Sequence, residues 1–556
     1  MTRNTIEEEL KKGLGRLGVP DAPFAVSVPE KGFGDYSTNA PLVAAKELSL
    51  TPREVAQALL ENIADGLPFV EKIEIAGPGF LNFYLSRSYL CDSLKSILSE
   101  GWKEGAVLAG KEILIEYTSP NLFKPLHIGN LVGNILGESL SRLLEYEGAH
   151  VRRINYPSDI GLTVAKGVWG LISTGGDPRD IKALGKAYQV GNTAYEDDVT
   201  AKGEIDDINK ALYEGSNATL NVLREEGIRT SRAHLSALCA VLGTQFDTEF
   251  FESESGPLGR DIVLAHINDV FEKSDGAIVY RGEQDGLHTR VFLNSQGLPT
   301  YEAKDIGLFD LKSRAYPQFD TSLTVTGAEQ TDYFKVVFAA IRRVFHDRLK
   351  NKNLHHIANG FLRLSTGKMS SRKGNVITGE SLIEDIKAMV KEKMKNHPIS
   401  DMEKVATSVA IAGIKYSILR QAAGGDIVFD PEKSLSFEGD SGPYLQYSYV
   451  RACSIKKKAQ VENLVPEVSA DMPISSVEKL LIYFPEVVER AALEYQPHLL
   501  TTYLTTLAGA FNSWYAKERI VEDSEAGRHK LAVTEAFRIT MERGLWLLGI
   551  AAPQEM

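Results

Sequence analysis

The stretch from residue 112 to residue 161 constrains the fold most strongly, because it alternates strand, helix and strand. EILIEYTS at 112–119 is an apolar run typical of a buried strand, and HVRRINYPSDIG at 150–161 resumes a strand. Between them, apolar residues recur at helical spacing over 129–147, and Gly148 ends the predicted helix. A strand–helix–strand unit needs parallel strands, so we predict an α/β fold with a parallel sheet.

The rest of the chain divides around this unit into further domains. Residues 1–105 read as a small α+β domain, with helices near 6–17 and 41–64 and a strand pair over 70–86 split by Gly-Pro-Gly. The predicted catalytic domain spans 106–395 and contains a mainly helical insertion at about 172–290. Residues 396–556 carry successive apolar stripes at helical spacing, which predicts an all-α C-terminal domain.

Composition narrows the function classes. The chain has 556 residues and a net charge of -12, which argues against a nucleic-acid partner unless a local basic surface exists. Its 3 cysteines form no CxxC pair, so we expect neither a disulfide framework nor a zinc site, and no bound metal. The charged N-terminus lacks a signal peptide, and no apolar run could span a membrane, so we expect a cytoplasmic protein without membrane contact.

The strongest local motif is SPNLFKPLHIGN at 119–130, which lies between a predicted strand and a predicted helix. Backbone N–H groups and the helix dipole favour phosphate at such a helix N-terminus. His127 and Asn130 add polar groups there, and Gly129 lets a ligand approach the backbone. Taken alone, the motif fits equally well a helix cap with an incidental histidine.

The second motif is GKMSSRKGNVIT at 367–378, which has no apolar periodicity and is predicted to be a loop. Its closely spaced donors suit a pyrophosphate whose charge grows in the transition state. The alternative is a solvated basic turn. The candidate ATP-binding residues of this loop are Lys368, Met369, Ser370, Ser371, Arg372 and Lys373.

Together the two motifs resemble the signatures of class I aminoacyl-tRNA synthetases, and the specific resemblance is to the arginyl-tRNA synthetases. The pattern SxNxxKPxHxGH of that family is matched by Ser119, Asn121, Lys124, Pro125, His127 and Gly129. FGDYSTN, AGPGFLNFYL, the GPYLQY segment and the terminal LGIAAPQEM are also similar to family segments and occur in the same order. The resemblance covers essentially the whole chain.

The resemblance implies a Rossmann-like catalytic domain that binds ATP, with Mg²⁺ arriving on the nucleotide. Lys124, His127, Asn130, Lys368 and Lys373 would be catalytic, and Pro125 and Gly129 would join them in binding ATP. An arginine pocket needs carboxylates for the guanidinium and polar groups for the α-amino group. The positions that match the family pocket are Glu116, Ser119, Asn121, Tyr301, Asp305 and Gln330.

The sequence departs from the family pattern at three positions. Asn130 replaces the second histidine of the first motif, and Ser371 stands where many class I enzymes have a second lysine. Either Lys124 or Lys373 could supply the missing charge. Tyr333 occupies a position where the family usually has histidine, so we assign it no catalytic role. Outside these motifs, Asp159 could orient ribose or substrate, or could be a simple turn residue.

Candidate tRNA contacts come from both terminal domains. In the helical domain, Tyr447 and Arg451 share a helix face at i,i+4 spacing, and Trp514 is a second aromatic candidate for an unpaired anticodon. In the N-terminal domain, the candidates for the tRNA elbow are Tyr36, Asn39 and Asn82. Core packing is the alternative for the candidates of the helical domain.

The resemblance therefore predicts a monomeric arginine–tRNA ligase that activates L-arginine with ATP and transfers it to the terminal adenosine of tRNA(Arg). Three alternatives remain open at this point. A class I lysyl-tRNA synthetase would also fit the motif pair, although the N-terminal GPGFLN and the GPYLQY segment argue against it. The others are a non-catalytic tRNA-binding paralogue and a small nucleotidyltransferase, for which the chain is too long.

Overall fold

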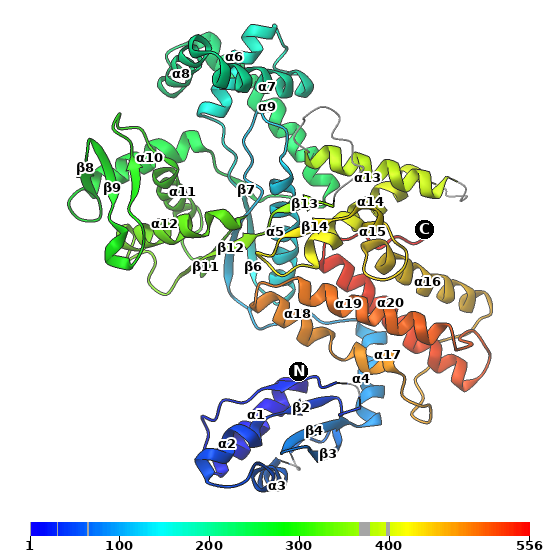
Figure 1. Cartoon of the computed structure of the whole chain (residues 1–556). Coiled ribbons are helices and arrows are strands. Elements are labelled where there is room, and N and C mark those ends of the chain that lie inside the picture. The colour runs from blue at the N-terminus through cyan, green and yellow to red at the C-terminus, as the bar shows by residue number, and fades with distance from the viewer. Residues whose placement is uncertain (1, 31, 64–65, 366–377, 396–400) are drawn as a thin grey trace.

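The computed structural model describes residues 2–30, 32–63, 66–365, 378–395 and 401–556, and its centre is a five-stranded sheet ordered β12-β11-β5-β6-β7. Every neighbouring pair in this sheet is parallel, which confirms the predicted α/β fold. Its strands are β5 (Glu112–Glu116), β6 (His150–Asn155), β7 (Thr248–Glu249), β11 (Thr321–Gly327) and β12 (Asn353–Asn359). Helix α5 (Ile128–Tyr146) connects β5 to β6 and lies near the middle of the molecule (Figure 1).

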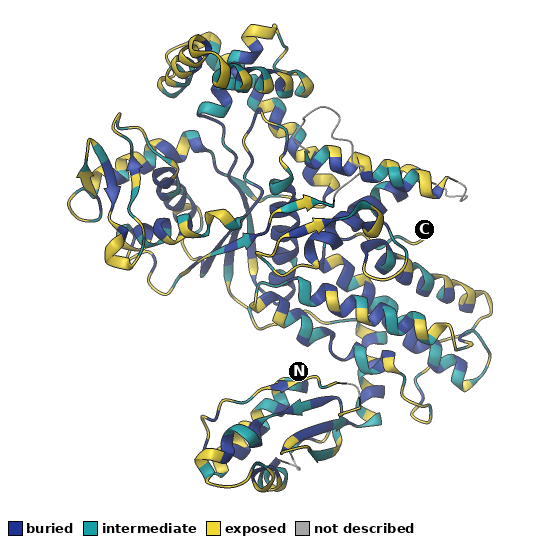
Figure 2. Cartoon of the chain, viewed as in Figure 1, coloured by how far each residue is buried: buried dark blue, intermediate teal, exposed yellow. Residues whose placement is uncertain are grey.

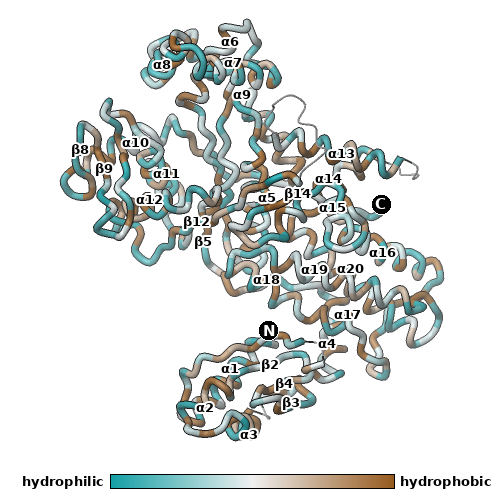
Figure 3. Tube along the Cα trace, viewed as in Figure 1, coloured by the Kyte–Doolittle hydropathy of each residue, from teal (hydrophilic) through white to brown (hydrophobic). Residues whose placement is uncertain are grey.

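Helix α5 is buried over most of its length, because its apolar residues face both the sheet and the helical domain. Leu131, Ile135 and Leu143 are each at most 1% exposed. The hydropathy colouring is correspondingly stronger around α5 than on the outer helix α8 (Val199–Glu214) (Figure 3). A central helix of this kind fixes the position of the motif at its N-terminus.

The segment predicted as one insertion at 172–290 forms two excursions, because β7 returns to the central sheet between them. The first contains α6 (Leu162–Thr174), α7 (Ile181–Asp197), α8 and α9 (Ala218–Val241). The second contains α10 (Glu252–Ala265) and an antiparallel sheet of β8 (Glu272–Ser274), β9 (Ala277–Tyr280) and β10 (Arg290–Leu293). The chain then continues through α11 (Tyr301–Ala315), β11 and α12 (Thr331–Val344) to β12, β13 (Leu362–Leu364) and α13 (Gly379–Met394).

The N-terminal domain is the predicted α+β unit, with an antiparallel sheet ordered β1-β2-β4-β3. The helix predicted over 41–64 is instead two helices, because Ser49 takes a left-handed φ of 53° and Pro52 starts the second helix. The elements are α1 (Thr2–Arg16), β1 (Val26–Ser27), β2 (Tyr36–Thr38), α2 (Ala40–Leu48), α3 (Pro52–Ile63), β3 (Val70–Ala76) and β4 (Phe80–Leu85). Helix α4 (Arg87–Glu100) leads to the central sheet.

The C-terminal region is the predicted helical domain, with one short strand in addition. Its helices are α14 (Met402–Leu419), α15 (Pro431–Ser434), α16 (Gly442–Val461), α17 (Ser476–Leu481), α18 (Phe484–Leu493), α19 (His498–Tyr515) and α20 (Glu525–Leu547). Strand β14 (Ile427–Phe429) pairs in parallel with β13, so the predicted boundary at 395 is crossed by a small sheet. Buried residues line the inner faces of the bundle, whereas α8 is largely exposed (Figure 2).

The N-terminal domain contacts the helical domain near α17 and α18 (Figure 1). Asp35 accepts from Lys479 at 2.7 Å, and its carbonyl oxygen accepts from the Tyr483 hydroxyl at 2.8 Å. Arg87 on α4 forms an ion pair of 2.8 Å with the buried Glu478. Among the described helices, none combines the length and apolar character needed to cross a membrane.

Candidate active site

A cavity of about 610 Å³ opens at the carboxyl ends of the central strands. The chain leaves β5 for β6 on one side of it, whereas β11 and β12 lie on the other side. The direction of the strand order therefore changes at β5, and ligands of open parallel sheets bind at such a switch point. The cavity brings together residues predicted from separate parts of the sequence: Glu116, Ser119, Asn121, His127, Gly129, Asn130, Tyr301, Asp305 and Gln330.

The turn between β5 and α5 has an unusual backbone. Thr118 and Ser119 both take positive φ angles, 74° and 38°, and such residues cost about 1–3 kcal/mol each unless their surroundings hold them in place. The Asn130 amide donates to the Thr118 carbonyl at 2.7 Å, and the Ser119 hydroxyl accepts from the Tyr156 N–H at 3.3 Å. Asn130 therefore holds this turn, in addition to lining the cavity.

His127 is the N-cap residue of α5, which explains how the motif is placed. Its Nδ1 accepts from the Gly129 N–H at 3.1 Å. Partial burial, followed by the charge of Lys124, lowers the pKa of His127, so the imidazole is neutral at pH 7. A neutral ring that accepts at Nδ1 carries its proton on Nε2 and offers a donor there.

Carboxylates gather at the β5 and β6 side of the cavity. Glu116 forms a buried ion pair with Lys312 at 2.8 Å, and a second buried pair joins Glu252 to Lys304 at 2.6 Å. Asp305, which lies beside them on α11, has no cationic partner within the described part of the chain.

The hydroxyl of Tyr333 donates to Asp305 at 2.5 Å. Desolvation, followed by the charge of Glu116, raises the pKa of Asp305 to about 7. Because its negative charge is not balanced, Asp305 is the carboxylate best able to accept an incoming guanidinium.

Tyr301 and Asp305 lie one helical turn apart on α11 and both line the cavity, as their spacing predicts. Tyr301 is 69% exposed at the mouth, and Lys304 lies 5.2 Å from its ring centroid. Gln330 lines the same cavity from the short turn between β11 and α12. These side chains reach the cavity from α11 and from the turn before α12, opposite the motif on α5.

Sequence reasoning missed several residues of this cavity. Glu252 and Lys304 carried no motif signal, because their pairing is visible only in the fold. Tyr333 was assigned no role, yet its hydroxyl contacts Asp305. Conversely, Asp159 binds Arg224 at 2.6 Å and accepts from Ser253, so it joins α9 to α10 as a structural residue.

Lys124 and Pro125 line a neighbouring cavity of about 350 Å³ rather than the main one. Asn121 belongs to both cavities, so the two are adjacent. His234 and Glu380 interact across the smaller cavity at 2.6 Å. The predicted pyrophosphate loop at 368–373 lies outside the described residues.

The helical domain carries an aromatic–cation group at its surface, which we call the Arg451 cluster and define as Tyr447, Arg451 and Tyr515. The Arg451 guanidinium lies 4.7 Å from the ring centroid of Tyr447 and 5.0 Å from that of Tyr515. Tyr447 is 38% exposed, and Asn512 holds the guanidinium through a bond of 2.6 Å. Trp514 is half-buried and packs against Phe511 with centroids 6.0 Å apart.

The predicted elbow contacts of the N-terminal domain need correction. Tyr36 is 0% exposed, and its hydroxyl donates to Glu486 of α18 at 2.7 Å, because it lies in the contact with the helical domain. Asn82 is 3% exposed and accepts from Ser37 within the sheet. Asn39 is half-buried and accepts from the Ala25 N–H at 2.8 Å. Tyr36 and Asn82 are therefore packing residues and not surface contacts.

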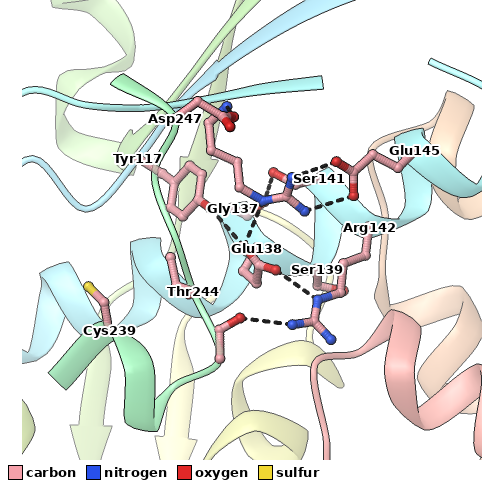
Figure 4. A network of polar contacts seen from close by, with 12 residues as sticks. Tyr117, Gly137, Glu138, Ser139, Ser141, Arg142, Glu145, Cys239, Thr244 and Asp247 are labelled. Atoms are coloured by element: carbon pink, nitrogen blue, oxygen red, sulfur yellow. Dashed lines mark hydrogen bonds and ion pairs between the residues drawn. The ribbon is translucent and has the colours of Figure 1, made fainter. Parts of the chain in front are cut away.

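A buried polar network supports α5 from behind the site (Figure 4). The carboxylate of Glu138 accepts from the Tyr117 hydroxyl at 2.8 Å, from Arg142 at 2.7 Å and from Arg153 at 3.0 Å. Arg142 also donates to the carbonyls of Trp546 and Gly243, both at 2.8 Å. The network thus joins the end of β5, the end of α9 and the last helix, α20.

Comparisons with known proteins agree with this architecture. The family model described as "tRNA synthetases class I (R), catalytic domain" matches residues 93–431. The "DALR anticodon binding domain" matches residues 445–556, and the "Arginyl tRNA synthetase N terminal domain" matches residues 2–85.

Similar whole proteins carry the same family name. "Arginine--tRNA ligase 2" of Bacillus anthracis is 31% identical over 528 residues, covering 92% of each chain. "Arginine--tRNA ligase" of Archaeoglobus fulgidus is 28% identical and covers 99% of each. The solved arginyl-tRNA synthetase of Thermus thermophilus superposes with a TM-score of 0.83 at 26% identity, over 100% of both chains. The chain therefore belongs to the arginyl-tRNA synthetase family of class I aminoacyl-tRNA synthetases.

Proposed function

We propose that this protein is an arginine–tRNA ligase, which forms arginyl-adenylate from L-arginine and ATP and then charges tRNA(Arg). The observation that carries the proposal is the unbalanced carboxylate of Asp305, in the same cavity as the N-terminus of α5. A guanidinium and a triphosphate could thus be held together at one site.

The first step needs no covalent enzyme intermediate. A carboxylate oxygen of arginine attacks the α-phosphorus of ATP, the bond to the bridging oxygen breaks, and pyrophosphate leaves with its Mg²⁺. In the second step, a ribose hydroxyl of the terminal adenosine attacks the carbonyl carbon, and AMP leaves. Positioning and electrostatic stabilisation carry both steps.

We assign the arginine side chain to Asp305, supported by Tyr301 and by the carboxylates of Glu116 and Glu252. Asn121, Ser119 and Gln330 surround the remaining polar part of the amino acid. For ATP we assign the Nε2–H of His127 and the open backbone at Gly129 to the phosphates, with Asn130 holding the turn above them. We assign Lys124, whose charge acts on His127 from the adjacent cavity, as a further source of positive charge.

We assign anticodon stacking to the Arg451 cluster, because its exposed aromatic ring and cation suit unpaired bases. Trp514 is a supporting residue, and Asn39 is the remaining elbow candidate of the N-terminal domain. We further propose that the enzyme acts as a monomer in the cytoplasm, with no membrane partner.

Aminoacylation of tRNA with labelled arginine or lysine tests the proposal directly, and the variant Asp305→Asn tests its chemistry. Asn keeps the size of the side chain but removes the charge, so arginine charging should fall at least about tenfold through a higher KM for arginine. Asp332→Asn, at an exposed carboxylate paired with Lys335, is the matched control and should charge normally. Charging with lysine instead of arginine would overturn the proposal.

A further inference from the structure

Asn359 is a polar residue at the carboxyl end of β12, on the strand face directed toward α5. Ile357, two residues earlier on the same face, packs in the core around α5. The Oδ1 atom of Asn359 lies 4.0 Å from the position that a Cβ on Gly133 of α5 would occupy. Asn359 therefore faces α5 across the active-site cavity and lines it.

The carboxamide of Asn359 is available to a ligand in the cavity. Asn359 is only 6% exposed, although it can donate two hydrogen bonds and accept two. Across the described ranges 2–30, 32–63, 66–365, 378–395 and 401–556, no group of the protein forms a hydrogen bond with this side chain. A ligand in the cavity can therefore form hydrogen bonds with both ends of this carboxamide without displacing a group of the protein.

The position of Asn359 in the cavity indicates which part of a ligand it meets. The carboxylates Glu116 and Asp305 lie on the β5 side, and His127, which we assigned to the phosphates, lies at the N-terminus of α5. Asn359 lies on β12, beyond β11 and away from the carboxylates. When arginine and ATP are bound together, the guanidinium lies at one end and the phosphates lie in the middle. The nucleoside of ATP is then left for the part of the cavity beside β12.

The walls of this region suit a flat heterocycle. Val325, Phe361 and Leu362 contribute apolar surface to the cavity there. Gly133 has no side chain on the facing helix, which leaves room beside the carboxamide. An asparagine side chain matches adenine, because its oxygen accepts from the 6-amino group while its N–H donates to a ring nitrogen.

We propose that Asn359 recognises the edge of the adenine base of ATP and is a determinant of nucleotide specificity. This inference rests on the proposed function, since it concerns the nucleotide of that reaction. Removing the 6-amino group of adenine abolishes the hydrogen bond that the oxygen of Asn359 accepts. A paired contact of this kind discriminates by about 5- to 160-fold.

The test compares ATP with purine riboside 5′-triphosphate, which lacks the 6-amino group, in tRNA charging by the full-length protein. The wild-type protein should have a kcat/KM for ATP that is at least about fivefold higher. In Asn359→Ala this ratio should fall to near one, mainly through a higher KM for ATP, whereas KM for arginine should stay unchanged. A purely structural role would instead lower charging equally with both nucleotides.

Asn155→Ala is the matched control, because Asn155 is also a buried amide at the end of a central strand but lies outside the cavity. Its Oδ1 also lacks a hydrogen-bond partner, and the control should keep the wild-type ratio. A wild-type ratio near one, or an unchanged ratio in a folded Asn359→Ala, overturns the inference. A wild-type ratio near one overturns the inference even where the variant does not fold, and absence of arginine charging by wild type refutes the proposed function instead.

Discussion

Replacing Glu138 by alanine tests whether the buried network behind α5 stabilises the catalytic domain. The side chain of Glu138 is 5% exposed and accepts from Tyr117, Arg142 and Arg153. Removing one partner of a buried charge network costs about 3–5 kcal/mol, because the remaining groups stay buried without compensation.

The structure places the expected cost at the lower end of that range. Arg153 keeps the carboxylate of Glu145 at 2.5 and 2.8 Å, and Arg142 keeps two backbone carbonyls. The phenol of Tyr117 loses the carboxylate that accepts from it and keeps only the neighbouring Ser141 hydroxyl. Burial and then the charge of Glu138 raise its pKa far above the ordinary value, so the phenol stays protonated and depends on an acceptor. We therefore expect a loss of about 3 kcal/mol in the free energy of unfolding.

Thermal unfolding followed by circular dichroism measures this loss. The melting temperature of Glu138→Ala should fall by about 6–12 °C. Asp92→Ala is the control, because its ion pair with Lys95 is exposed, at 71% and 60%, and should matter little. A loss for Glu138→Ala no larger than that of the control would refute the reasoning.

Three further outcomes are expected. Desolvation and then the charge of Glu116 raise the pKa of Asp305 to about 7, so its carboxylate is present above that pH and is lost below it. We therefore expect kcat/KM for arginine, measured from about pH 6 to about pH 8.5, to fall below pH 7. A flat profile would contradict this. Arg451→Ala should raise KM for tRNA about tenfold with KM for arginine unchanged, and an equal rise in Lys456→Ala, whose lysine is paired within the bundle, would count against a specific role. Tyr36→Phe should lower the melting temperature and leave KM for tRNA unchanged, since its hydroxyl binds a buried carboxylate of α18; the opposite pattern would restore Tyr36 as a tRNA contact.

Local sequence patterns predicted the parts of the fold that depend on local physics. The apolar spacing of α5 and the Gly-Pro-Gly turn between β3 and β4 identified both elements, because each is set by neighbouring residues. The return of β7 to the sheet was not predictable, since a strand of Thr248 and Glu249 has no apolar period. Strand β14 has β-prone residues, but at 3 residues it is too short to stand out within a helical domain, and its pairing with β13 is visible only in the structure.

The same distinction applies to the site. His127 and Asn121 could be identified because they belong to one continuous motif. Glu252 could not, because its place in the cavity depends on the course of the chain through α9 and β7. Tyr36 was misassigned because a polar aromatic in a small domain gives no sign that another domain covers it, as Glu486 and Tyr483 do here.

The parallel pairing of β13 with β14 has a mechanical consequence. Leu362 belongs both to β13 and to the wall of the active-site cavity, and it pairs with Ile427 of β14. Strand β14 in turn connects α14 to α15, at the root of the helical domain. A movement of the start of the helical domain relative to the cavity must therefore either break the hydrogen bonds between β13 and β14 or move Leu362 in the cavity wall. The two regions are thus mechanically coupled.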